Sequence, residues 1–214
     1  DASSRFAPEN QWGNFGSIGG AWLISNEDFF QNIEANWIDL LKLKASYGMQ
    51  GNDNLIYQGA TNYYPYLDQY KVFNADGDFA TSLYYKGNRD ITWETSHSFN
   101  IGTEFSLFRE RLVGSIEYFT RRTSDLLYYQ PVPESLGYSS IPMNVGEIVN
   151  KGIELDLTAN LINTSNFSWR VNLNATSYKN EILDLAEGVR ESGIKGSTYI
   201  YEVGGSLYDA FLRD

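Results

Sequence analysis

Two carboxylates that could do acid–base chemistry lie close together in the second half of this sequence. Glu154 and Asp156 are separated by one residue, and a pair of acidic side chains flanking a scissile bond is what a glycoside hydrolase uses. Residues two apart on a β-strand also point to the same side of a sheet. Such a pair is most often an ordinary solvated strand face, and we interpret Glu154 and Asp156 in this way.

The single histidine is a second candidate for catalysis. His97 lies between Ser96 and Ser98, whose hydroxyls are potential nucleophiles. Neighbouring residues on a strand point to opposite faces, so no serine–histidine pair forms locally. A catalytic triad would need a distant partner that the sequence does not reveal, and we therefore do not expect an enzyme.

Residues 74–78, with the sequence NADGD, contain oxygen ligands of the kind that calcium prefers. They lack the Asp-x-Asp-x-Asp-Gly spacing and the closing glutamate of a calcium-binding loop. We predict a polar turn here, with no metal and no cofactor.

The strongest candidates for ligand binding are tyrosines gathered between two predicted strands. Loop tyrosines present a flat apolar ring and a polar tip, which suit stacking on sugar rings and contact with another protein. Packing of the loop on itself, or a girdle at a membrane interface, explains them equally well. Trp93 is expected to belong to a girdle or to anchor the loop. The tyrosines are Tyr57, Tyr63, Tyr64, Tyr66, Tyr70, Tyr84 and Tyr85.

The elements that position these residues are revealed by alternating apolar and polar residues within residues 151–180. A period of two is typical of a β-strand with two different faces. Each run is longer than an average strand, and about 9–11 residues cross a bilayer on a tilted strand. The short connection between the runs predicts a hairpin. The apolar positions are Ile153, Leu155, Leu157, Ala159 and Leu161 in the first run, and Phe167, Trp169, Val171, Leu173 and Ala175 in the second.

The same alternation recurs along the chain, so the sequence predicts serial hairpins. The fourth of the further runs is less regular than the others, and the fifth is short. The runs are residues 17–24, 41–48, 99–107, 112–121 and 198–203.

The connections between the runs alternate in length. Short turns that alternate with long loops are the rule in outer-membrane barrels, with the short turns on the periplasmic side. Residues 26–39 are an exception, since they are expected to carry a short helix capped by Ser25 or Asn26, with Glu27 and Asp28 in its first turn. The short connections are residues 108–111 and 162–166, and the long ones are residues 48–90, 125–145 and 183–197.

Composition and charge exclude several classes of protein. Hydrophobic residues make up 42% of the chain and charged residues 20%, as in an ordinary folded protein. No apolar stretch approaches the roughly 18 residues of a spanning helix, which excludes a helical membrane protein. The formal net charge of −11 opposes binding to nucleic acid. The absence of cysteine excludes disulfides, thiol catalysis and cysteine-ligated metals.

An ordered series of short motifs resembles one known family. The segments ASYGMQGN, ITWET, DLLYYQPVP and NKGIELDL look like parts of the barrel of the SusC/RagA-type TonB-dependent transporters of Bacteroidetes outer membranes. The resemblance extends over residues 4–208. It implies a barrel of 22 strands with a plug domain in its lumen, energy supplied through TonB, and a SusD-like lipoprotein as a lid. It also implies import of oligosaccharides or peptides.

In a barrel, one face of the hairpins meets outer-membrane lipid and the other lines the lumen. Ile153, Leu155, Leu173 and Phe105 belong to the face predicted to meet lipid. A soluble β-sandwich would divide the same residues between the same two faces, with the apolar face packed in its core. Strand length, loop asymmetry and the resemblance must therefore separate the two folds. The residues predicted to line the lumen are Glu104, Glu154, Asp156, Arg170 and Asn172.

A plugged barrel needs several hundred residues, whereas these 214 supply six or seven strands. We therefore expect residues 1–214 to be an all-β arc of antiparallel hairpins, taken from a 22-stranded transmembrane barrel. A signal peptide, TonB box and plug would precede Asp1, and the closing strands would follow Asp214. The alternative is a secreted β-sandwich that binds carbohydrate or acts as an adhesin.

Overall fold

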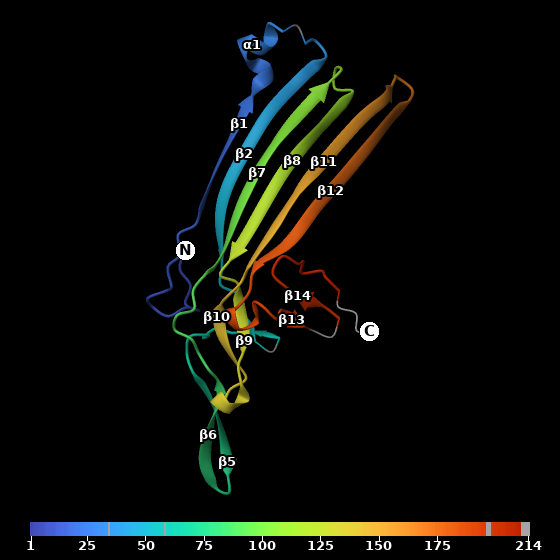
Figure 1. Cartoon of the computed structure of the whole chain (residues 1–214). Helices are drawn as coiled ribbons and strands as arrows, with labels where there is room; N and C mark the ends of the chain where they lie inside the picture. Colours follow the sequence, from blue (N-terminus) through green and yellow to red (C-terminus); the bar gives the residue numbers. More distant parts are fainter. Residues whose placement is uncertain (34, 58, 196–197, 211–214) are drawn as a thin grey trace.

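The computed structural model describes residues 1–33, 35–57, 59–195 and 198–210. It is built almost entirely from antiparallel strands, as the alternation predicts (Figure 1). A long sheet forms one end of the molecule, and smaller hairpins and loops form the other. Among the described residues, no helix combines the length and the apolar character needed to cross a bilayer. The arc predicted for residues 1–214 includes Ser197 and residues 211–214, which lie outside the described residues.

Six strands form the long sheet, in the order β1-β2-β7-β8-β11-β12, and each is antiparallel to its neighbours. The predicted series of hairpins is confirmed. All of the strands except β1 extend beyond the runs that predict them, because polar residues at their ends continue the ladder, whereas β1 ends at Leu23, one residue before the end of its run. The strands are β1 (Gly16–Leu23), β2 (Ile38–Asn52), β7 (Glu94–Leu107), β8 (Leu112–Ser124), β11 (Glu147–Asn163) and β12 (Ser168–Asp184).

The β7–β8 and β11–β12 turns at the upper end of the sheet in Figure 1 are short, and the first of them is strained. Phe108, Arg109 and Glu110 have φ values of 59°, 60° and 62°, a left-handed conformation that costs energy for residues with a side chain. The rings of Trp37 and Phe108 stack with their centroids 5.7 Å apart. The backbone N–H of Glu110 donates to the Asp39 carboxylate at 2.9 Å. These contacts hold the turn between β7 and β8.

The connection between β1 and β2 carries the predicted short helix, but the cap differs from the prediction. A 3-10 turn (Ile24–Asn26) is followed by α1 (Asp28–Gln31). The N-cap residue is Glu27 and no side chain caps the helix, so the prediction of a Ser25 or Asn26 cap is wrong. The 3-10 turn takes up both residues, which leaves the extended cap position to Glu27. Asp28 lies in the first turn, as predicted.

The long connections lie at the opposite end of the sheet and contain short strands and turns of their own. The hairpin of β5 and β6 projects farthest from the sheet (Figure 1). The short seventh run, residues 198–203, contains a two-residue strand that pairs with another two-residue strand and does not join the long sheet, and Tyr199 forms an isolated bridge with Ala210. The elements are β3 (Ile56–Tyr57) with β4 (Ala60–Thr61), β5 (Gln69–Ala75) with β6 (Asp78–Tyr85), β9 (Leu127–Pro131) with β10 (Ser140–Asn144), β13 (Ile194–Lys195) with β14 (Ile200–Tyr201), and the 3-10 turns η2 (Glu134–Leu136) and η3 (Glu187–Val189).

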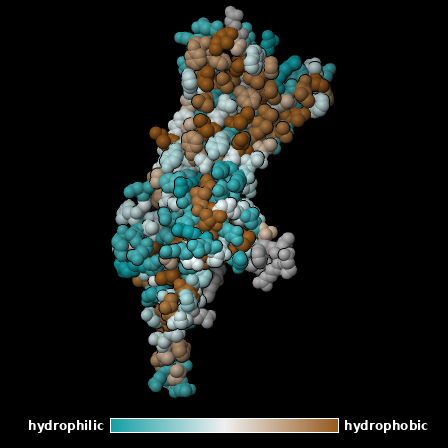
Figure 2. Space-filling model, viewed as in Figure 1, coloured by the Kyte–Doolittle hydropathy of each residue, from teal (hydrophilic) through white to brown (hydrophobic). Residues whose placement is uncertain are grey.

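The sheet leaves its apolar face uncovered. Ile153 and Leu173 on this face are 53% and 52% exposed, and Figure 2 shows hydrophobic residues at the surface of the sheet end of the molecule. The buried hydrophobic cluster lies at the loop end instead, and is formed by Phe6, Leu55 and Ile91. A β-sandwich buries such a face against a second sheet about 10 Å away. The described residues therefore do not form the sandwich that the sequence left open.

Gly102 of β7 marks a point of close approach between strands. A methyl group there would lie 2.7 Å from the carbonyl oxygen of Ile116 and 3.1 Å from Cα of Glu117. We expect Gly102→Ala to lower the free energy of unfolding of the full-length protein by about 1–3 kcal/mol, because the neighbouring backbone must move. Thermal unfolding in detergent, followed by circular dichroism, measures this loss. Gly20→Ala is the matched control, since nothing lies within 4 Å of a methyl group there, and an equal loss at both positions would contradict the close approach.

Candidate functional site

The register of the sheet gathers the predicted polar residues on one face. Residues directly opposite each other in neighbouring strands share a face of the sheet. Glu104 lies opposite Ser115, and Ser115 lies opposite Asp156. Glu154 is two residues from Asp156 in β11 and therefore points to the same side.

The remaining two predicted residues lie on this face near the short turn between β11 and β12. Arg170 is opposite Asn160, and its Nε donates to Asn160 Oδ1 at 2.9 Å. Asn172 is opposite Thr158, and its Nδ2 donates to Thr158 Oγ1 at 2.9 Å. All five residues predicted to line a lumen thus share one face, and the lumen itself stays a prediction at this point.

A chain of ion pairs crosses three strands on the same face. Glu104 lies 3.1 Å from Lys42 Nζ and 3.3 Å from Lys44 Nζ, and Lys44 also lies 2.8 Å from Glu117. Lys44 reaches over β7 at Gly102, which is opposite both Lys44 and Glu117 and has no side chain to obstruct the contact. Partly exposed pairs of this kind contribute little stability each. Sequence reasoning did not single out these pairs, because the partners are fixed only by the strand register.

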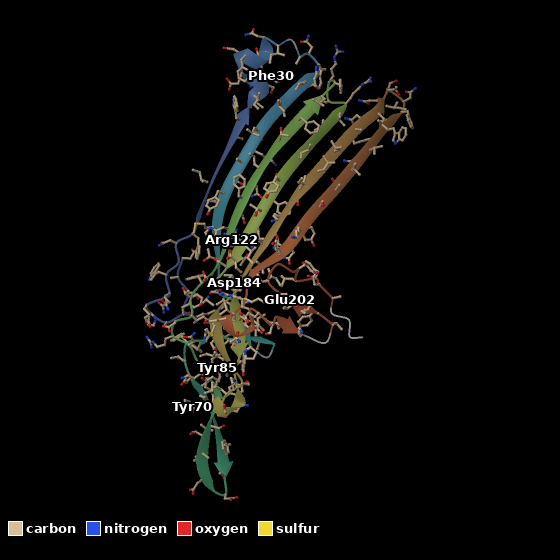
Figure 3. The ribbon with its side chains drawn as sticks, viewed as in Figure 1. Phe30, Tyr70, Tyr85, Arg122, Asp184 and Glu202 are labelled. Carbon is tan, nitrogen blue, oxygen red and sulfur yellow. The ribbon has the colours of Figure 1, made fainter. Side chains whose placement is uncertain are left out.

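Some of the predicted ligand-binding tyrosines pack within the loop, where Tyr57 and Tyr66 are half-buried and Tyr85 is buried. The Tyr57 ring lies 5.1 Å from that of Tyr85 and 4.8 Å from that of Tyr129, between centroids. Tyr85 is 2% exposed, and its hydroxyl donates to the Pro65 carbonyl at 3.2 Å (Figure 3). Tyr66 packs against the buried cluster at the loop end. These rings tie the loop between β2 and β7 to the hairpin of β9 and β10.

Other tyrosines of the predicted set are open to solvent. Tyr63, Tyr64 and Tyr70 are 61%, 55% and 60% exposed, and Tyr70 lies in the projecting hairpin (Figure 3). Tyr84 is 36% exposed, and the Lys71 ammonium lies 3.9 Å from its ring centroid. The structure thus divides the predicted set into rings that stabilise the loop and rings that a ligand or a partner protein can reach.

His97 and its neighbouring serines point to opposite faces, as predicted. His97 Nδ1 lies 2.7 Å from the Tyr47 hydroxyl, within hydrogen-bonding distance. The Ser96 hydroxyl lies 2.8 Å from that of Thr123. Ser98 is two residues from Ser96 in β7 and shares its face. The local arrangement therefore cannot act as a nucleophile and base.

Two further sequence predictions concern the loops. Residues 74–78 form the tip of the β5–β6 hairpin, where the N–H of Gly77 donates to Asn74 Oδ1 at 2.9 Å, which confirms a polar turn. Trp93 packs at 5.3 Å from Phe6, between ring centroids, and its Nε1 donates to the Gln11 carbonyl at 3.2 Å. Trp93 is thus a loop anchor. Within the described part of the chain, no three potential metal-ligating side chains gather.

Comparison with known proteins places this geometry in context. A family model described as TonB dependent receptor-like, beta-barrel, matches residues 2–204. The chain is 36% identical to TonB-dependent receptor P39 of Formosa agariphila over 208 residues, which cover 97% of the chain and 19% of that protein. It is 31% identical to TonB-dependent receptor SusC of Bacteroides thetaiotaomicron over 196 residues, which cover 88% of the chain and 19% of that protein. The chain spans about a fifth of the length of these relatives.

Solved structures show the same arrangement of strands. The structure of the RagAB peptide transporter matches with a TM-score of 0.81 at 30% identity, over 94% of this chain and 21% of that one. The RagAB peptide importer in the "closed-closed" state matches with a TM-score of 0.82 at 29% identity, over 95% of this chain and 22% of that one.

Burial of Tyr85 makes the packing of the loop sensitive to alkaline pH. Burial raises the pKa of the Tyr85 hydroxyl above that of a free tyrosine. The contribution of Tyr85 to loop stability is therefore complete below about pH 10, the pKa of an unfolded tyrosine, and is lost as the pH rises further. We expect proteinase K to cut residues 53–93 of the full-length protein faster at pH 11 than at pH 9. Tyr85→Phe should reduce this pH dependence, although the lost hydrogen bond costs about 1 kcal/mol at neutral pH.

Tyr70→Phe is the control for this experiment, since Tyr70 is 60% exposed. Equal pH dependence of cleavage in the wild type and in Tyr85→Phe would show that Tyr85 does not hold the loop.

Proposed function

The chain belongs to the TonB-dependent receptor-like β-barrel family, and from this membership we propose that it is part of an outer-membrane transporter that imports nutrients. The observation that carries the proposal is the six-stranded sheet with one polar face and one exposed apolar face. Lipid is the environment in which such an apolar face is stable without a covering layer of protein.

The proposed barrel needs strands on both sides of this sheet. β1 and β12 are its edge strands, and β12 is exposed along most of its length. Unpaired strand edges do not occur in the hydrocarbon region of a membrane, because lipid cannot satisfy the backbone groups. We propose that the rest of the protein supplies the pairing strands, so that this sheet is an arc of a barrel of 22 strands. The short turns then face the periplasm and the long loops the exterior.

Charge supports the choice of the face that lines the lumen. Lys44 lies near the middle of β2, on the same face as Glu104 and Glu154. A lysine that faces lipid costs free energy at any depth of the hydrocarbon region, up to about 2–4 kcal/mol at the bilayer midplane. We therefore assign this face, with Asp156, to the lumen and the opposite face to lipid.

Aromatic side chains on the opposite face support the same orientation. They occur near both ends of the apolar band, as in the aromatic girdles of membrane barrels. The girdle proposed for the periplasmic interface comprises Trp22 and Trp169 on this face, with the stacked rings of Trp37 and Phe108 at the adjoining turn, and the girdle proposed for the external interface comprises Tyr47, Phe99 and Tyr118.

The proposed cargo is an oligosaccharide or a peptide. The RagAB protein that this chain resembles is described as a peptide transporter, which supports a peptide as one cargo class. On the external side we assign contact with cargo or with a lid to the open tyrosines Tyr63, Tyr64 and Tyr84. Energy would reach the barrel from TonB through regions of the protein beyond this segment.

We further propose a SusD-like lipoprotein as the lid over the external mouth. The β5–β6 hairpin projects from the loops and exposes apolar rings, with Phe79 85% and Phe73 48% exposed. Exposed aromatic rings on a protruding element suit contact with a partner protein. Purification of the full-length protein with no accompanying lipoprotein would contradict this partner.

Uptake by cells that carry the full-length protein tests the proposed function. We expect labelled oligopeptides or oligosaccharides to accumulate at least tenfold faster in these cells than in cells that lack the gene. Deletion of TonB should abolish the difference, because the barrel has no energy source of its own. Equal accumulation with and without TonB would contradict active transport, and no accumulation of either cargo class would contradict nutrient import.

A further inference from the structure

The face of the sheet that we assign to lipid changes character near its loop end. Along β8, β11 and β12, all of whose residues the structure describes, the positions on this face are uncharged from the short turns as far as the row of Tyr118. Beyond that row, toward the loops, the same face carries charges. The charged residues are Arg122, Glu147, Lys151, Lys179 and Glu181.

The three cations of this group come from three adjacent strands. Lys151 of β11 is directly opposite Lys179 of β12. Arg122 of β8 is opposite Val149 and therefore diagonal to Lys151. Opposite and diagonal neighbours on one face of a sheet are about 5 Å and about 7–8 Å apart. Side chains as long as those of arginine and lysine can therefore converge on one group the size of a phosphate.

The carboxylates on this face do not balance the cations. Arg122 pairs with Glu147, and its Nη2 donates to Glu147 Oε2 at 2.9 Å. Glu181 Oε2 is shared, at 3.5 Å from Lys151 Nζ and 3.2 Å from Lys179 Nζ. Two ammonium groups directly opposite each other repel, and a single carboxylate compensates one of them. Three cations against two carboxylates leave one positive charge in excess on this face, in a chain whose net charge is −11.

The surroundings do not supply the missing negative charge. Asp184 lies opposite Glu147 beyond an irregularity in the ladder, and its carboxylate is paired with Arg190 at 2.7 Å. Arg122 and Lys151 belong to strands that have described neighbours on both sides. The strands that complete the proposed barrel therefore pair at other edges, and a plug in the lumen would lie on the opposite face.

The three cations stay accessible in spite of their ion pairs. The side chains of Arg122, Lys151 and Lys179 are 60%, 45% and 64% exposed. A guanidinium has five N–H donors and an ammonium has three, so each group can keep its carboxylate and still donate to another anion. Both groups are common ligands of phosphate in proteins.

The apolar band begins next to the cations. Lys151 is two residues from Ile153 along β11, and Arg122 is four residues beyond Tyr118 along β8, which at about 3.3 Å per residue is about 7 Å and about 13 Å. Ile153 is 53% exposed and Ile116 is 45% exposed. A ligand with an anionic head and acyl chains would contact both regions, whereas a free phosphate ion would contact only the first.

We propose that Arg122, Lys151 and Lys179 form a binding site for a phosphate-bearing lipid of the external leaflet. The cations hold the phosphate, and the acyl chains run along Ile153 and Ile116 toward the centre of the membrane. Basic groups near a membrane surface attract anionic lipid in this way. The inference rests on the proposed function, since it needs this face to meet lipid, and it adds a specific lipid that anchors the barrel in one leaflet.

Native mass spectrometry of the full-length protein in detergent tests the site, with lipid A as the probe and the same lipid A without its phosphates as the comparison. The wild type should bind lipid A at least about tenfold more tightly than the dephosphorylated form. Arg122→Gln should weaken the binding of lipid A about tenfold, because charge-assisted hydrogen bonds are lost. Arg121→Gln is the matched control. It removes the same charge one residue away on the opposite face, and should change nothing.

A second variant separates the site from a loss of structure. Glu181→Gln should strengthen the binding of lipid A about threefold, because the two lysines no longer share a carboxylate with the phosphate. Damage to the fold does not produce tighter, phosphate-dependent binding. Unchanged or weaker binding by Glu181→Gln would contradict the role of the two lysines.

Several other results would overturn the site. Equal affinity of the wild type for the two forms of lipid A would leave only acyl-chain contact, and equal losses in Arg121→Gln and Arg122→Gln would show that the face does not matter. Displacement of lipid A by an equal concentration of inorganic phosphate would indicate a site for the free ion. A disulfide between two copies of a Ser177→Cys variant in lipid vesicles would assign this face to contact between copies.

Uptake measured on the same proteins separates this inference from the proposed function. Normal TonB-dependent uptake by the wild type, without any preference for phosphorylated lipid A, rejects only the lipid site. Absence of uptake by the wild type rejects import itself. Loss of lipid A binding in Arg121→Gln, with none in Arg122→Gln, would reverse the proposed assignment of the two faces.

Discussion

The mutual pairing of long, two-faced strands is the constraint on which the rest of this structure depends. Lipid offers no hydrogen-bond partner to a backbone N–H or carbonyl, so proposed membrane strands must satisfy one another along their whole length. A one-residue slip in register would exchange the two faces of a strand. The register that places Glu104 and Asp156 on one face therefore also places Phe105 and Leu155 on the other.

At the end of the sheet that we propose to be external, the loops contain structure of their own. They contain the buried cluster of Phe6, Leu55 and Ile91, which Trp93 covers. Packing of Tyr85 into the same region joins segments that are far apart in sequence. The loops are thus ordered supports that present other rings, and the face of the sheet that we assign to the lumen carries the charged residues.

A period of two was sufficient to predict the six long strands and the common face of Glu154 and Arg170. The strand ends were not predictable, because polar residues such as Ser124 continue the ladder without an apolar signal. The contact of Lys44 with Glu117 was not predictable for a different reason. It depends on which residues the strand register brings together across β7. The roles of the tyrosines depend on tertiary packing, which composition does not reveal.

The measurement that tests the central assignment most directly is the accessibility of spin labels on the two faces of β11. Labels would be attached to cysteines introduced by Glu154→Cys and Leu155→Cys in the full-length protein, in lipid vesicles and without other reactive cysteines. A lipid-facing Leu155 predicts that the label at this position collides more with oxygen, which concentrates in lipid, than with a water-soluble nickel complex. A lumen-facing Glu154 predicts the reverse. The same preference at both positions would contradict a two-faced strand in a membrane.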